Sequence, residues 1–194
     1  MINDKWQDLQ QLKPPNPEQL EDIKSHLDLV LLALEAIAGI TSEAILQAAR
    51  ELNLESIVGD RISLWRLRQS NPHRKSSGGR KKLDVEEARS LVLIICHLAK
   101  QHQELIRRAV SLLEQVTAQN KQPHHTALLG DYLDKFINFY QERIKIQIPT
   151  SSQSLSQLAL KLLIDLLFYS GDRGHRLLWL AIFDSASKGG HDEG

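Results

Sequence analysis

The stretch DVEEARSLVLIICHLAKQHQELIRRAVSLLEQVTAQN, residues 84–120, decides the fold. It contains no glycine or proline, and its apolar side chains recur every three or four residues, the period of a helix with one apolar face. A continuous helix of this length would reach about 50 Å at about 1.5 Å per residue. The recurring positions are Val85, Ala88, Val92, Ile95, Ala99, Ile106, Ala109, Leu113 and Val116. We therefore predict an all-α fold packed around a long central helix over residues 84–120.

The rest of the chain predicts a single domain of six or seven helices. Residues 1–16 are expected to form a flexible N-terminal arm that ends at two prolines, residues 17–187 the helical domain, and residues 188–194 a disordered tail. Gly39 and Asn53 stand where left-handed residues would end helices. Besides the central helix, helices are expected at residues 17–38, 41–52, 56–69, 126–145, 155–169 and 177–187.

Composition narrows the class of protein. A chain of 194 residues fits one domain. The single cysteine, Cys96, excludes an internal disulfide framework and suits a reducing compartment. No apolar run approaches the 18 or so residues of a membrane-spanning helix, and the first residues are polar. We therefore expect a cytoplasmic protein without a membrane span.

Charge is distributed unevenly although the 24 basic and 24 acidic residues balance. Residues 17–60 carry nine acidic and two basic residues, whereas residues 61–82 carry eight basic residues and no acidic one. Within the latter, residues 71–82 are rich in glycine and serine, which is typical of a flexible connection. We call residues 61–82 the basic segment. Its predicted partner-binding residues are Arg66, Arg68, Arg74, Lys75, Arg80, Lys81 and Lys82.

Three interpretations of the basic segment remain open. It can bind the acidic surface of a partner protein. It can bind nucleic acid, with Trp65 nearby and with counterion release making the affinity depend on salt. It can also fold back on the acidic helices of residues 17–60, in which case it has no external partner.

Candidate chemistry elsewhere is sparse. Cys96 lies among leucine and isoleucine residues, so we expect a buried structural thiol. His102 occupies an apolar position of the central stripe and indicates either a hydrogen-bonded core histidine or a bend near residues 101–103. A turn at GDRG, followed by His175 and Arg176, resembles an anion site, but a capped turn is the commoner structure. The eight histidines do not show metal-ligand spacing. We predict no catalytic residue, metal site or cofactor, and hence no enzyme.

Three segments carry a resemblance to a known family: LDLVLLALEAIAGITSEAILQAARELNL (27–54), LWRLRQSNP (64–72) and GRKKLDVEEARSLVLIICHLAK (79–100). Over about residues 27–184, the chain resembles a family of small all-helical cyanobacterial proteins labelled as a domain of unknown function. The resemblance implies an intracellular bacterial protein and supplies no catalytic residue.

These observations predict a non-enzymatic cytoplasmic adaptor or regulatory protein that acts through protein–protein contacts. Its basic segment would contact an unidentified partner with an acidic surface. The alternative is a nucleic-acid-binding protein that uses the same residues. The near-heptad stripe also permits a homodimer through a helix pair, although an antiparallel neighbour in the same chain would satisfy it equally.

Overall fold

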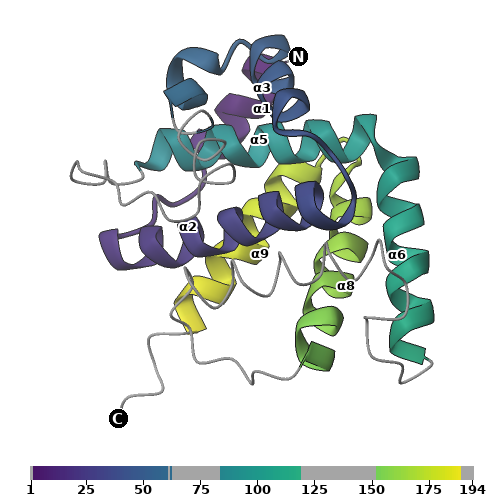
Figure 1. The fold of residues 1–194 in the computed structure, drawn as a ribbon. Coiled ribbons are helices and arrows are strands. Elements are labelled where there is room, and N and C mark those ends of the chain that lie inside the picture. The colour runs from purple at the N-terminus through teal and green to yellow at the C-terminus, as the bar shows by residue number, and fades with distance from the viewer. Residues whose placement is uncertain (1, 61, 63–83, 119–151, 189–194) are drawn as a thin grey trace, which may run out of the picture.

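We describe the fold from a computed structural model, which covers residues 2–60, 62, 84–118 and 152–188. All regular secondary structure in these ranges is helical, which confirms the predicted all-α class (Figure 1). The elements are α1 (Ile2–Gln10), α2 (Pro17–Leu32), the π-helix η1 (Ala33–Ile37), α3 (Ser42–Glu51), α5 (Val85–Gln101), α6 (Gln103–Ala118), α8 (Ser152–Tyr169) and α9 (Gly174–Lys188). Residues 55–60 are also helical. The helix predicted at 126–145 and most of the one at 56–69 lie outside the described residues.

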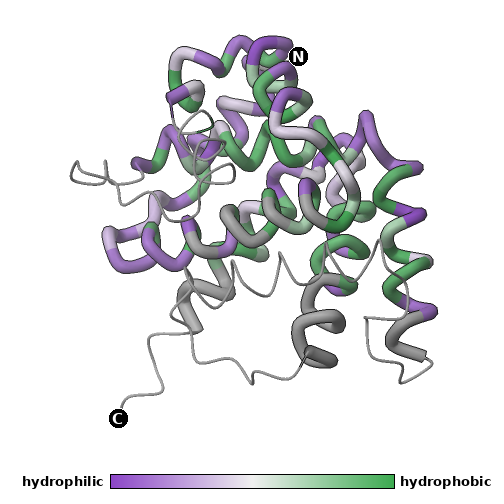
Figure 2. The backbone as a smooth tube through the Cα atoms, in the orientation of Figure 1, coloured by the Kyte–Doolittle hydropathy of each residue, from purple (hydrophilic) through white to green (hydrophobic). Residues whose placement is uncertain are grey.

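Helix α5 is the centre of the domain. Asp84 accepts a hydrogen bond from the Glu87 backbone, and the Glu87 carboxylate accepts one from the Asp84 backbone, so a capping box fixes where the helix begins. Residues 87–95 are all buried, because α1, α2, α3, α8 and α9 all pack against α5. Figure 2 shows hydrophobic residues recurring along the helices that pack on α5. The predicted central position of this helix is confirmed.

The prediction of one helix over residues 84–120 is wrong, because the chain breaks at His102. This residue has φ −115° and ψ 30°, outside the helical region, and its backbone N–H closes α5 by donating to Leu98 O at 2.9 Å. Helix α6 then leaves in a different direction and lies beside α8 (Figure 1). Its buried residues are Ile106, Ala109 and Leu113. At residue 102 the apolar stripe is occupied by a histidine with polar neighbours, so a continued α5 would bury no apolar side chain there. After the change of direction, α6 packs its own apolar side chains against α8.

The expected flexible arm of residues 1–16 is also wrong, because residues 2–10 form α1. Leu9 is fully buried, and Trp6 and Leu12 pack partly against the core. Helix α1 packs on α5 and α9, so the start of the chain contacts its last helix. The apolar residues at positions 6, 9 and 12 follow a helical spacing, and their burial stabilises a helix too short to persist alone.

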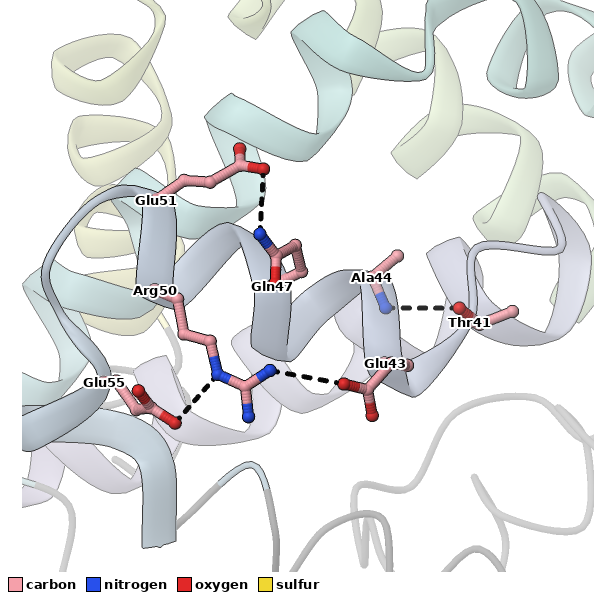
Figure 3. Close-up of polar contacts among 7 residues, drawn as sticks. All are labelled: Thr41, Glu43, Ala44, Gln47, Arg50, Glu51 and Glu55. Atoms are coloured by element: carbon pink, nitrogen blue, oxygen red, sulfur yellow. Dashed lines mark hydrogen bonds and ion pairs between the residues drawn. The ribbon is translucent and has the colours of Figure 1, made fainter.

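The remaining helix ends follow the sequence. Thr41 caps α3 by accepting a hydrogen bond from the Ala44 backbone at 3.2 Å (Figure 3). Asn53, at φ 56°, and Gly39, at φ 74°, adopt the left-handed conformation as predicted. The π-helical turn at residues 33–37, where Ala38 N donates to Ala33 O at 3.1 Å, was not expected from the sequence.

Candidate functional site

All seven predicted partner-binding residues lie in 63–83, outside the described residues. What the structure does describe is where the basic segment starts and where it ends. Val58 and Ile62 are buried in the core just before residue 63, and the capping box at Asp84 follows just after residue 83. The basic segment therefore connects two points that are fixed on the domain.

Carboxylates of the acidic region 17–60 are partly used within the domain. Arg50 donates from Nε to Glu55 at 3.1 Å and from Nη1 to Glu43 at 3.4 Å, on one side of α3 (Figure 3). Glu51, at the end of the same helix, accepts a bond from Gln47 at 3.3 Å. These contacts are exposed to solvent, so each contributes little to stability. They partly neutralise the negative charge in and just after α3.

Glu51 also reaches across to α5. Its Oε2 lies 2.9 Å from His97 Nε2 and accepts a hydrogen bond from Gln101 Nε2 at 2.9 Å. These hydrogen bonds, led by the one from His97, lower the pKa of the Glu51 carboxyl group. Nothing in the sequence pattern indicates this contact, because His97 and Glu51 are 46 residues apart.

A cavity of about 420 Å³ lies next to this contact, and we call it the α1–α5–α9 cavity. Helix α1 contributes one side, the end of α3 and the last two turns of α5 another, and the turn from α8 to α9 a third. Its lining consists of Lys5, Glu51, Leu52, Leu93, Cys96, His97, Lys100, Gln101, Ser170, Gly171, Asp172 and His175.

Cys96 lies in the wall of this cavity. Burial raises the pKa of its thiol to about 12, and the positive charge of Lys5 opposes the rise only weakly. The thiol is therefore protonated at neutral pH and acts as a small apolar group, not as a nucleophile. This agrees with the predicted structural cysteine, although the residue is only partly buried.

The two residues that follow the GDRG turn contact α1. His175 Nε2 lies 3.0 Å from Asp8 Oδ2, and Arg176 Nη1 donates to Asp8 Oδ1 at 2.8 Å. Desolvation by itself would raise the pKa of Asp8, but the hydrogen bonds with His175 and Arg176, together with their charges, outweigh it and lower the pKa. The sequence reading missed this cluster because it predicted no helix at residues 2–10.

His175 is unusual within the cluster. Its side chain is buried, and its second ring nitrogen, Nδ1, has no hydrogen-bond partner in the described part of the chain. Buried polar atoms nearly always have a partner, because an unpaired one costs about 1–3 kcal/mol. His175 also lines an open, polar hollow of about 480 Å³ with Asp4, Lys5 and Arg173.

Nowhere in residues 2–60, 84–118 or 152–188 do three or more His, Cys, Asp or Glu side chains converge as a metal site would require. Within the same ranges, the helices are too short or too polar to cross a bilayer.

Comparison with known proteins gives one family. No curated protein and no solved structure matches the chain. The family described as "Protein of unknown function (DUF3038)" matches residues 20–184, which include every described helix from α3 to α8 and most of α2 and α9. The chain belongs to the DUF3038 family.

Proposed function

We propose that this protein is a non-enzymatic adaptor or regulatory protein of the bacterial, specifically cyanobacterial, cytoplasm that acts through protein–protein contacts. The basic segment, residues 61–82, is its contact surface. The observation that carries the proposal is the charge of this segment: eight basic residues and no acidic one in 22 positions.

The anchoring of the segment supports this assignment. Ile62 and the capping box at Asp84 fix its two ends on the same domain. A connection held at both ends loses less conformational entropy when it binds than a free tail of the same length. An acidic partner surface would meet these cations with complementary charge, which raises the rate of association.

Exposed apolar side chains offer contacts of a second kind. Phe168 on α8 is 74% exposed, and four leucines on α6 and α9 are also exposed: Leu105, Leu112, Leu177 and Leu180. Scattered exposed leucines are normal on a protein surface, but an aromatic ring this exposed is typical of a contact residue. A protein partner would cover these apolar side chains in addition to meeting the cations of the basic segment.

Affinity purification from the native cell tests the proposal. The test variant changes Arg80, Lys81 and Lys82 to Glu. The control variant changes three exposed cations of α6 and α8, Arg107, Arg108 and Lys161, to Glu, which alters the net charge equally. We expect the wild type and the control variant to capture partners that the test variant does not capture. Identical partner sets for all three proteins would refute the basic segment as the contact surface.

The alternative function is nucleic-acid binding through the same residues. If all eight cations contacted phosphates, the logarithm of the affinity would fall with that of the salt concentration with a slope of about −7. A mobility-shift titration over salt measures this slope. We expect no retardation of DNA or RNA near physiological ionic strength. If the wild type instead binds with a steep salt dependence and the test variant does not bind, the protein is a nucleic-acid-binding protein and the adaptor proposal is refuted.

A further inference from the structure

We propose that the α1–α5–α9 cavity binds a small molecule that combines a carboxylate with an apolar body. The proposal does not depend on the basic segment, which does not line the cavity. It is carried by the size of the cavity, by its apolar wall and by the cations in its lining.

Size and wall fit such a ligand. A volume of about 420 Å³ falls within the range of about 300–1,000 Å³ found for small-molecule sites. Leu52 and Leu93 line the cavity with buried side chains, and Cys96 adds a thiol that is uncharged at neutral pH. When the apolar body of a ligand packs against these three uncharged side chains, its surface is removed from water, which favours binding.

The charged groups of the lining differ in how they are used. Glu51 is engaged by His97 and Gln101. Lys5 and Lys100, by contrast, form no ion pair or hydrogen bond with any other residue in the described ranges. Their ammonium groups, from α1 and α5, are lining groups that remain available to an anion.

Helix α9 adds one feature that favours an anion. It begins at Gly174, two residues after the lining residue Asp172, and the first turn of a 15-residue helix carries partial positive charge. His175, in that first turn, also lines the cavity.

Asp172 and Glu51 are the lining carboxylates, and both oppose an anion, although Glu51 is engaged by His97 and Gln101. Asp172 is exposed, and its carboxylate would repel a bound carboxylate across the same cavity. This residue makes the proposal sharper, because removing its charge should strengthen binding while most substitutions in a binding site weaken it.

Isothermal titration of the full-length protein with octanoate tests the proposal. Octan-1-ol and octylamine are matched probes with neutral and positive head groups. We expect octanoate to bind more tightly than either, and butanoate and hexanoate to bind more weakly by about fourfold per missing methylene. No saturable binding of octanoate, or equal binding of all three head groups, would overturn the proposal.

Three variants locate the site. Replacing Lys5 and Lys100 together by Met should weaken octanoate binding by about tenfold and leave octan-1-ol unaffected. Lys13→Met, at an exposed position outside the cavity, should change neither affinity. Asp172→Asn should tighten octanoate binding by about threefold. Unchanged octanoate affinity in the double variant and in Asp172→Asn would place any binding elsewhere and refute the site; circular dichroism checks that each variant is folded.

Discussion

Replacing Arg89 by Met should make this protein more stable. Arg89 lies on α5 and is 8% exposed, yet no carboxylate in the described residues forms an ion pair with it. Its guanidinium carbon stands 5.7 Å from the centre of the Trp179 ring, and Nη2 donates to Leu12 O at 3.4 Å. Its Nε is buried without a hydrogen-bond partner among the described residues. Burial lowers the pKa of Arg89, against the pull of Glu86, so the folded protein disfavours the charged form.

The interactions of Arg89 do not offset the cost of its burial. An unpaired buried donor costs about 1–3 kcal/mol, and more when the group is charged. The cation–π contact with Trp179 returns about 1–2 kcal/mol. The bond to Leu12 O adds little, because 3.4 Å is beyond the usual range of N–H···O bonds. Methionine keeps an apolar stem of similar length and makes a sulfur–aromatic contact with Trp179, worth about 0.3–1.5 kcal/mol. We expect Arg89→Met to raise the free energy of unfolding by about 1 kcal/mol.

Urea denaturation and thermal melting at neutral pH measure this change. For a chain of this size, 1 kcal/mol corresponds to a rise in Tm of about 2–4 °C. Arg89→Ala is the matched control, because it also removes the charge but leaves a void beside Trp179; it should lower the stability by about 1–2 kcal/mol. If Arg89→Met lowers the free energy of unfolding by 1 kcal/mol or more, the guanidinium stabilises the fold and the reasoning is refuted.

Three further predictions concern the regions around the α1–α5–α9 cavity. A β-carbon at Gly174 would lie 1.6 Å from Tyr169 O, so Gly174→Ala should lower the free energy of unfolding by several kcal/mol, measured by urea denaturation. The control Gly171→Ala, whose β-carbon would meet its nearest atom at 3.8 Å, should change the stability by less than about 1 kcal/mol. Equal losses of stability in the two variants would contradict the close approach at Gly174. The pKa of Asp8 is lowered in the folded state. Its ionised carboxylate therefore contributes fully to the stability of the fold above the ordinary pKa of 3.8, and this stability is lost as the pH falls through the folded-state pKa. Asp8→Asn should therefore reduce stability at pH 7 and have a progressively smaller effect on unfolding below about pH 4; a loss that does not change with pH would exclude the charge as its cause. Because the pKa of Cys96 is about 12, iodoacetamide should label the native protein at pH 8 more than tenfold more slowly than the protein unfolded in guanidinium chloride. Similar labelling rates would mean that the thiol is not held in its buried, protonated state.

Local patterns in the sequence predicted the helices and their ends well. The left-handed Gly39 and Asn53 and the start of α5 all depend on residues within a few positions of one another, so the sequence carries the whole signal. The periodicity of residues 84–120 gave the correct buried face on both sides of His102. It did not give the change of direction, because an apolar stripe has the same period in one helix as in two.

Contacts between distant residues could not be predicted in this way. Asp8 meets His175 and Arg176 across 167 and 168 positions, and Glu51 meets His97 across 46. Each residue alone looks like an ordinary surface group, and nothing in the spacing pairs them. The lining of the α1–α5–α9 cavity comes from such distant segments, so the sequence suggested none of it as a site. The charge of the basic segment is readable from the sequence alone, but its partner is not.

The pairing of α1 with α9 has a consequence for how the chain matures on the ribosome. Helix α1 is made first, but residues 174–176, which cover it, are made more than 160 positions later. At about 5–20 residues per second, translation takes about 10–30 s to supply them. During that interval α1 lacks its contact with α9, and Asp8 lacks both of its partners, so the helix is open to chaperones or to a second nascent chain. The domain is in this sense closed only when α9 has been made.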